Sequence, residues 1–175
     1  MFKTFILSLF LISNFTYARG KTERAGDILT LLIPSVAYGT TLVNGDKEGQ
    51  MEFYKSYGST VVLTSILKET VRERRPNNSS STASFPSGHA SSAFSGATFI
   101  HKKYGIEYAI PAYLGAIYTG YSRVYAEKHY THDVIAGALL GMGLSWYFTS
   151  DKGSVTVSPL INAQTDVGVR VSYNW

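Results

Sequence analysis

The sequence of 175 residues has no cysteine and little charge. Without cysteine the chain cannot form disulfides, thiolate metal sites or a cysteine nucleophile. Charged residues make up 16% of the sequence, below the roughly 25% that is usual for soluble domains. The net charge is only +4, and the Lys and Arg residues are not gathered in one block. A nucleic-acid partner is therefore poorly supported, and we expect none.

Apolar residues are abundant: 45% of the sequence is hydrophobic and 13 residues are tyrosine, which favours boundaries between water and an apolar phase. Four stretches lack charge, and the longest reach only the lower end of the roughly 17–25 residues that cross a bilayer. We interpret them as helices of a compact all-α bundle that is at least partly lipid-associated. In the last stretch, Gly137 and Gly141 have the small-xxx-small spacing of closely packed helices. The stretches are Ile28–Asn44, Ser56–Leu67, Tyr108–Ser122 and Val134–Ser150.

The first 18 residues have the layout of a secretory signal peptide. Lys3 precedes an apolar core, and Thr16–Ala18 resembles an A-x-A cleavage site, so we expect cleavage after Ala18. An uncleaved membrane anchor is the alternative. Either way the prediction is export, to the periplasmic face of a bacterial membrane. Residues 19–150 then form the helical domain.

The last 25 residues, 151–175, differ in kind. Apolar and polar residues alternate from Val167 to Trp175, and a period of two indicates a strand with one apolar face. The preceding "SVTVSPLINA" supplies a second strand, with the connection near Asn162–Asp166. The sequence thus predicts a short C-terminal β-hairpin after the helical core.

Cations follow the second uncharged stretch. Lys68, Arg72 and Arg75 are spaced to share one helix face, and Pro76 predicts that the helix ends near Arg75. A solvated basic face is the alternative. A loop then leads to Pro86-Ser87-Gly88-His89, where free N–H groups of Ser87 and Gly88 at a helix start would form an anion site, with His89 beside it.

A third segment holds Ser122-Arg123, then His129 and Asp133. Spaced four apart at the start of a helix, the Asp133 carboxylate would lie beside the His129 ring and fix which nitrogen keeps its lone pair. A metal site of His129, His132 and Asp133 is an alternative, but no further ligand is evident. His132 is otherwise expected at the surface.

Together the three segments resemble the signature of the type 2 phosphatidic acid phosphatase superfamily, which also includes bacterial acid phosphatases and vanadium haloperoxidases. The resemblance covers residues 68–133 and implies the helical bundle of that family. Eleven positions match in order and spacing: Lys68, Arg75, Pro76, Pro86, Ser87, Gly88, His89, Ser122, Arg123, His129 and Asp133.

The resemblance also implies roles for these residues. His129 would attack phosphorus and form a phosphohistidine, with Asp133 orienting its ring. His89 would protonate the leaving oxygen and then activate water. Phosphate would be bound by Lys68, Arg75 and Arg123 with the N–H groups of Ser87 and Gly88, so that no metal or other cofactor is required.

The substrate expected from this sequence is a phosphorylated membrane lipid: phosphatidate-like, a polyprenyl diphosphate or lipid A. The main alternative is a secreted, soluble, nonspecific acid phosphatase. A vanadium haloperoxidase and a non-catalytic surface binding protein are less favoured, the latter because it leaves His89, His129 and Asp133 without a purpose. The oligomeric state is not indicated by the sequence.

Overall fold

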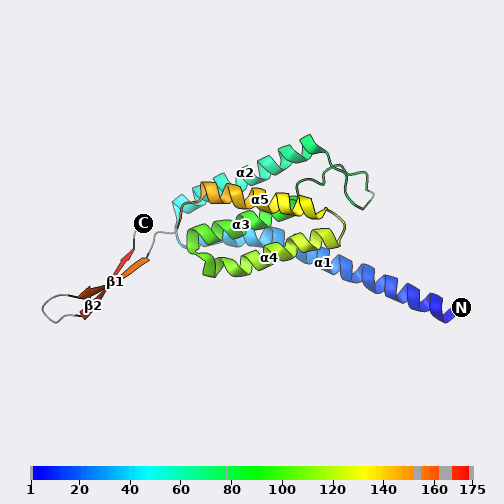
Figure 1. The fold of residues 1–175 in the computed structure, drawn as a ribbon, viewed down its shortest axis with the longest axis horizontal. Helices are drawn as coiled ribbons and strands as arrows, with labels where there is room; N and C mark the ends of the chain where they lie inside the picture. Colours follow the sequence, from blue (N-terminus) through cyan, green and yellow to red (C-terminus); the bar gives the residue numbers. More distant parts are fainter. Residues whose placement is uncertain (1, 78, 152–154, 162–166, 174–175) are drawn as a thin grey trace.

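The computed structural model describes residues 2–77, 79–151, 155–161 and 167–173, and the side chains of residues 20–77 and 79–151. Over these residues the chain forms five α-helices followed by a β-hairpin (Figure 1). The predicted all-α fold is confirmed, and the four uncharged stretches lie in helices except for Asn44, Thr149 and Ser150 at their ends. The elements are α1 (Phe2–Val43), α2 (Lys47–Val71), α3 (Gly88–Tyr104), α4 (Ile106–Tyr125), α5 (Thr131–Phe148), β1 (Val155–Ile161) and β2 (Val167–Tyr173).

The hairpin has the strands that the alternating pattern predicts. β1 and β2 pair antiparallel, from Val155 opposite Tyr173 to Ile161 opposite Val167. The predicted connection, Asn162–Asp166, lies outside the described residues. The side chains of both strands do too, so the apolar face stays a prediction.

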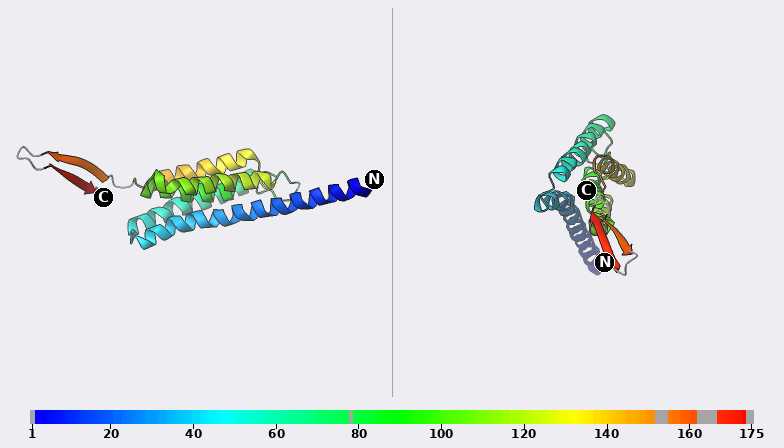
Figure 2. Two further views of the ribbon diagram at one scale, coloured as in Figure 1. Left: turned by 90° about the horizontal axis from the view of Figure 1, so that it is seen from below. Right: turned by 90° about the vertical axis from the view of Figure 1, so that its left-hand side faces the viewer.

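Helix α3 is the centre of the bundle, and each of the other four helices packs against it (Figure 2). Its residues from Ala90 to Ile100 are nearly all buried, and most are Ala, Ser, Gly or Thr. Small side chains let neighbouring backbones approach closely, which is how helices pack in the absence of a large apolar core. Helix α3 therefore fixes where the ends of its neighbours lie.

The closest approach is between α3 and α5, where the predicted glycine pair lies. A Cβ atom at Gly137 would come within 2.4 Å of the Ser87 carbonyl oxygen, and one at Gly141 within 2.2 Å of the Ser91 carbonyl oxygen. Only glycine permits this contact. It confirms the predicted close helix packing and holds the start of α5 against the start of α3.

A proline in α1 is compensated by α3. Pro34 has no N–H to donate to the carbonyl of Thr30, one turn earlier. The hydroxyl of Ser92 on α3 donates to that carbonyl instead, at 3.0 Å. The exchange links α1 to the central helix through a polar contact and gives the Thr30 carbonyl a donor.

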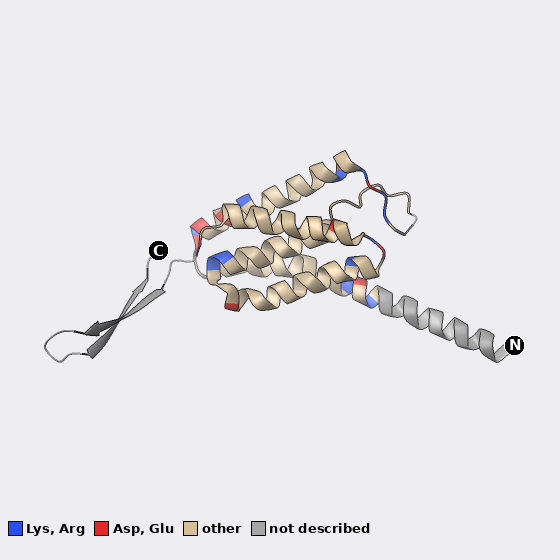
Figure 3. Ribbon diagram, in the orientation of Figure 1, with Lys and Arg blue, Asp and Glu red and all other residues tan. Residues whose placement is uncertain are grey.

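The bundle has small and hydroxyl-bearing residues inside and large apolar ones outside. Thr64 bonds Ser91 at 3.0 Å, and Ser95 bonds Ser145 at 2.8 Å, all in the interior. Exposed Leu, Ile, Val and aromatic side chains occur on α1, α2, α4 and α5. Charged residues lie near the two ends of the helices and leave the middle of the bundle without charge (Figure 3). This is the distribution expected of a protein in contact with lipid.

Helix α1 has one segment long and apolar enough to cross a membrane, Gly20–Val43, with a mean hydropathy of 1.4. It lies near the N-terminus and packs against the bundle along part of its surface. The helix runs without a break through the predicted cleavage site after Ala18. Cleavage there, and the division into residues 1–18, 19–150 and 151–175, stay predictions.

Candidate active site

The residues of the signature meet at one end of the bundle. There α2 and α4 end, α3 and α5 begin, and two loops connect them. The residues that precede α3, from Arg72 to Ser87, form the longer loop, and Ala126–Tyr130 form the shorter one. Helix ends supply unpaired N–H groups and carbonyls at such a junction. The polar side chains of the signature therefore have many possible hydrogen-bond partners nearby.

The prediction that helix α2 continues to near Arg75 is wrong. The helix ends at Val71, and Arg72 adopts a left-handed conformation (φ 53°, ψ 40°) with its N–H donated to the carbonyl of Lys68. The left-handed residue ends the helix one turn earlier than the following proline would require. Arg72 and Arg75 thus do not share the face of Lys68, and the exposed Arg72 side chain lies 3.9 Å from Glu69.

Two cations of the signature face the site with donors to spare. Lys68 Nζ donates to the carbonyls of Ala83 (2.9 Å) and Ser84 (3.3 Å), which leaves one of its three N–H groups. Burial and the charge of Arg75 lower the pKa of Lys68 to about 8, against the opposing effect of Asp133. The Nε atom of Arg75 is buried and has no hydrogen-bond partner in the described part of the chain. An anion would satisfy both groups.

The start of α3 differs in part from the prediction. The N–H of Ser87 is not free, because it donates to the carbonyl of Asp133 at 2.9 Å. Its hydroxyl caps the helix by accepting from the N–H of Ala90. The prediction that the Ser87 N–H is free is therefore wrong, since the tight α3–α5 contact uses it, while a role of Ser87 in phosphate binding stays a prediction. Gly88 is the first residue of the helix, so its N–H has no acceptor within α3, and anion binding there stays a prediction.

His129 and Asp133 lie together, but not on one helix face. Helix α5 begins at Thr131, so His129 lies two residues before it. Oδ2 of Asp133 accepts hydrogen bonds from the Ser84 hydroxyl (2.6 Å) and from the N–H of Tyr130 (2.9 Å), which caps the helix. The Nδ1 atom of His129 lies 3.6 Å from the same oxygen, with both side chains buried. The helix cap therefore brings the pair together.

Electrostatics favour a neutral His129. Burial is the main cause that lowers the pKa of this histidine, and the charges of Lys68 and Arg75 lower it further, while Asp133 opposes them. The imidazole is thus unprotonated near pH 7. Because Nδ1 faces the carboxylate, Nε2 is the nitrogen that is left to react.

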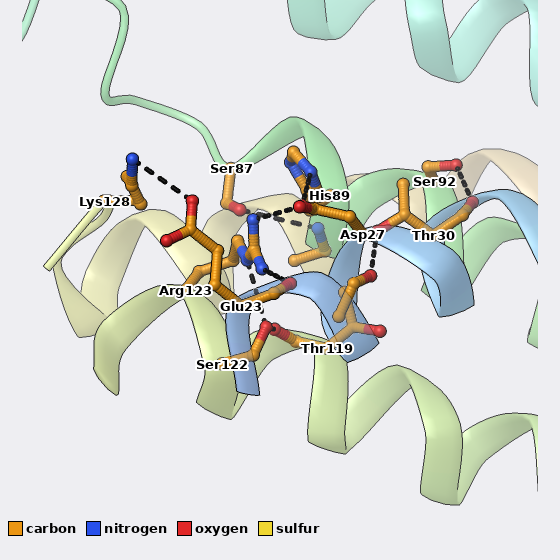
Figure 4. Close-up of polar contacts among 12 residues, drawn as sticks. Glu23, Asp27, Thr30, Ser87, His89, Ser92, Thr119, Ser122, Arg123 and Lys128 are labelled. Atoms are coloured by element: carbon orange, nitrogen blue, oxygen red, sulfur yellow. Dashed lines mark hydrogen bonds and ion pairs between the residues drawn. The ribbon is translucent and has the colours of Figure 1, made fainter. Parts of the chain in front are cut away.

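His89 and Arg123 share a partner that the signature does not contain. Arg123, with its side chain 3% exposed, donates from Nη1 to Asp27 Oδ1 (2.7 Å), from Nη2 to the Glu23 carbonyl (2.5 Å) and from Nε to the Ser122 hydroxyl (3.0 Å). The Nε2 atom of His89 lies 3.0 Å from the same Asp27 oxygen (Figure 4). Burial and Arg123 lower the pKa of His89, and Asp27 raises it.

A second group of potential metal ligands lies beside the site. His132 Nε2 is 2.9 Å from Glu73 Oε1 and 3.2 Å from Asp133 Oδ1, and one atom from each residue falls within a 4.8 Å cluster. The alternative metal set predicted from the sequence included His129, and here Glu73 takes that place. Because Glu73 already forms a hydrogen bond with the exposed His132, that contact explains this cluster. The expectation that the site uses no metal or cofactor stays a prediction.

Two residues of the site were missed by the sequence analysis. Asp27 directly precedes the first uncharged stretch, and no spacing in the sequence relates it to His89. Ser84 stands in a serine-rich loop and has nothing to distinguish it from its neighbours. Both are recognisable only once the helices are packed.

The comparisons with known proteins agree with the geometry. A family model described as the PAP2 superfamily matches residues 51–154. The chain is 36% identical over 96 residues to the lipid A 4'-phosphatase of Helicobacter pylori and 40% identical over 73 residues to the lipid A 1-phosphatase of Porphyromonas gingivalis. These matches cover 51% and 39% of this chain, but only 48% and 16% of the relatives. The chain therefore spans half or less of the length of the curated relatives it matches.

A solved structure has a related fold. The crystal structure of Aquifex aeolicus LpxE superposes with a TM-score of 0.54 at 25% sequence identity, over 70% of this chain and 84% of that one. The similarity extends beyond the segments that carry the signature, and includes most of the helical bundle.

Proposed function

Because the chain belongs to the PAP2 superfamily, we propose that it is a phosphatase that hydrolyses a phosphorylated membrane lipid through a phosphohistidine intermediate. One observation carries this proposal: a buried, neutral His129 lies beside Asp133, near Arg75, whose Nε has no hydrogen-bond partner among the described residues, and near Lys68, which donates two of its three N–H groups there. A neutral nucleophile next to unsatisfied cations suits a phosphate ester, whose equatorial oxygens need positive charge.

The reaction has two steps. Nε2 of His129 attacks phosphorus, the bond from phosphorus to the ester oxygen breaks, and His89 donates a proton to that oxygen. Water then attacks the phosphohistidine while His89 accepts its proton, which releases inorganic phosphate and restores both histidines. Asp133 stabilises the positive charge that develops on the His129 ring. Arg123, Lys68 and Arg75 bind the charged oxygens.

The surface of the bundle supports a lipid substrate. Large apolar side chains are exposed on four of the five described helices, and charge is confined to their ends. In a membrane the site would lie at the level of the lipid headgroups, where a phosphate is found. The two curated relatives are described as lipid A phosphatases, so lipid A is the first substrate to test. A secreted soluble phosphatase would expose this surface to water, which argues against that alternative.

The experiment is phosphate release in EDTA from a matched panel in detergent micelles. The panel holds a lipid A fraction, a polyprenyl diphosphate, a long-chain phosphatidate and a soluble aryl phosphate, with His129→Ala as the control. We expect the best lipid to have a kcat/KM at least about tenfold above the aryl phosphate, since binding of the lipid tail contributes to the transition state.

Each outcome separates one part of the proposal. Equal turnover of the aryl phosphate would replace the lipid phosphatase by a nonspecific one. Loss of activity in EDTA that a divalent cation restores would contradict the metal-free mechanism. Activity in His129→Ala equal to wild type would contradict the phosphohistidine.

Export to the periplasmic face is supported by the N-terminal segment, and alkylation of an introduced cysteine at exposed Glu127 in intact cells tests it.

A further inference from the structure

Asp27 is a carboxylate at the site that the proposed reaction does not use. Its Oδ1 atom lies 3.0 Å from His89 Nε2 and 2.7 Å from Arg123 Nη1 (Figure 4). The three residues come from three helices, α1, α3 and α4. One oxygen therefore joins the proposed acid to a proposed phosphate ligand.

The sequence around Asp27 is built for this contact. Glu23 lies four residues before Asp27, on the same face of α1, and Gly26 directly precedes Asp27. A Cβ atom at Gly26 would come within 1.9 Å of Ser122 Oγ and 2.8 Å of Arg123 Nη2, so glycine lets α1 approach α4. The Glu23 carbonyl then accepts from Arg123 at 2.5 Å. The Glu23 carbonyl and the Asp27 carboxylate, one helical turn apart, thus both accept hydrogen bonds from the Arg123 guanidinium.

The hydrogen bonds leave the reactive atoms available. A carboxylate only accepts, so the nitrogen of His89 that faces Asp27 carries the proton and Nδ1 is the other, open nitrogen. Arg123 uses three of its five N–H groups on Asp27, Glu23 and Ser122. The two that remain can bind phosphate while the contact to Asp27 is kept.

We infer that Asp27 is a positioning residue for His89: it holds Nε2 through a hydrogen bond, turns Nδ1 toward the ester oxygen, and ties Arg123 to helix α1. The catalytic consequence rests on the proposed function. The contact itself does not, and the two are tested separately.

The charges around His89 predict in which direction its pKa changes when Asp27 is replaced. Arg123 from α4 and Lys68 from α2 lower the pKa of His89, as does burial, and the Asp27 carboxylate from α1 raises it. His129, from the loop before α5, is neutral near pH 7. Asp27→Asn keeps the shape of the side chain and removes the opposing charge. The pKa of His89 should then fall further.

The first measurement is ¹⁵N NMR of the imidazoles in the full-length protein in micelles. The chain has four histidines, and the His89→Ala spectrum assigns the signal. In wild type we expect neutral His89 with its proton on Nε2. In Asp27→Asn we expect a lower pKa and a mixture of the two tautomers. An unchanged pKa and tautomer would overturn the inference, whether or not the protein is a phosphatase.

The second measurement is kcat/KM of Asp27→Asn for esters whose leaving groups differ in pKa, each over a range of pH. The matched control is Glu69→Gln, because Glu69 is an exposed carboxylate on α2. We expect Asp27→Asn to lose about tenfold or more on an alkyl phosphate, much less on an aryl phosphate whose leaving group needs no proton. The alkaline limb of its pH profile should move to lower pH. An equal loss on both esters with an unmoved profile would show a merely structural residue and overturn the catalytic role.

If the proposed function were wrong, the results would differ from those expected if only the role of Asp27 were wrong. Wild type would then match His129→Ala on every ester, while the NMR comparison would still report on the contact of Asp27 with His89. Thermal unfolding of Asp27→Asn in the same micelles, expected to be close to wild type, shows that the variant is folded.

Discussion

His129 and Asp133 are four residues apart in the sequence, whereas His89 and Asp27 are separated by 62. The first pair is made by one helix cap, which a single segment of chain encodes. The second is made only when α1 packs against α3 and α4. The first pair is also buried, while His89 and Asp27 are 37% and 48% exposed. The proposed nucleophile is thus held by local structure, whereas the proposed acid depends on tertiary packing.

The largest effects should separate the two histidines by chemistry. We expect His129→Ala to lower kcat on every phosphate ester by about three orders of magnitude or more, as removal of a covalent nucleophile does. His89→Ala should cost about 10²–10⁴-fold on an alkyl phosphate. On an activated aryl phosphate it should instead give a burst of phenol and accumulate phosphohistidine, detected with ³²P-labelled ester.

A burst in His129→Ala, or its absence in His89→Ala together with full steady-state turnover, would reverse the assignment of the two roles. His132→Ala is the matched control for removing an imidazole. Because His132 is exposed and paired with Glu73, we expect its activity to stay within about tenfold of wild type, as surface ion pairs contribute little.

Ser84→Ala tests the pair of His129 and Asp133, with a smaller expected loss of kcat. The Ser84 hydroxyl donates to Asp133 Oδ2 at 2.6 Å, and a hydrogen bond to a charged group contributes about 1.5–3 kcal/mol. We expect kcat to fall about tenfold to a hundredfold, with KM changed less than about twofold, because Asp133 would be less well oriented. Ser80→Ala, in the same loop but exposed, is the control. Equal kcat in the two variants would contradict this role of Ser84.

The pH profile of wild type compares both pairs at once. His129 must be neutral and its lowered pKa places the acid limb of kcat/KM well below pH 6.5. His89 must be protonated, and since its pKa is also lowered, activity should decline as pH rises through a value below 6.5. The optimum should therefore be acidic, with Asp27→Asn more acidic still. An optimum above pH 7 in steady-state kcat/KM would contradict this order.

The sequence predicted what is encoded locally. Uncharged stretches indicated the helices because low charge and helical length persist within one segment. Gly137 and Gly141 indicated close helix packing, but not that α3 is the partner. The end of α2 was predicted too late, since Pro76 marks only the last residue at which a helix can stop, and the left-handed Arg72 stops it earlier. Asp27 was not found because its role depends on a distance across the bundle.

The free N–H predicted for Ser87 is a second case in which tertiary packing could not be predicted from the sequence. A helix start predicts unpaired N–H groups, but which of them a neighbouring helix will use depends on packing. Here the carbonyl of Asp133 takes that N–H. Signature spacing therefore indicated residues that the fold brings together, and gave no information about which of their hydrogen-bonding groups are already occupied.

The contact between α1 and α4 also sets an order of events during synthesis. Asp27 leaves the ribosome 96 residues ahead of Arg123, and its carboxylate has no cationic partner from α4 until that helix has been made and has docked. Nascent chains that contain α1, α2 and α3 alone therefore hold His89 without a complete phosphate site. The candidate active site is complete only once α4, the loop with His129 and the start of α5 with Asp133 have been made and have docked.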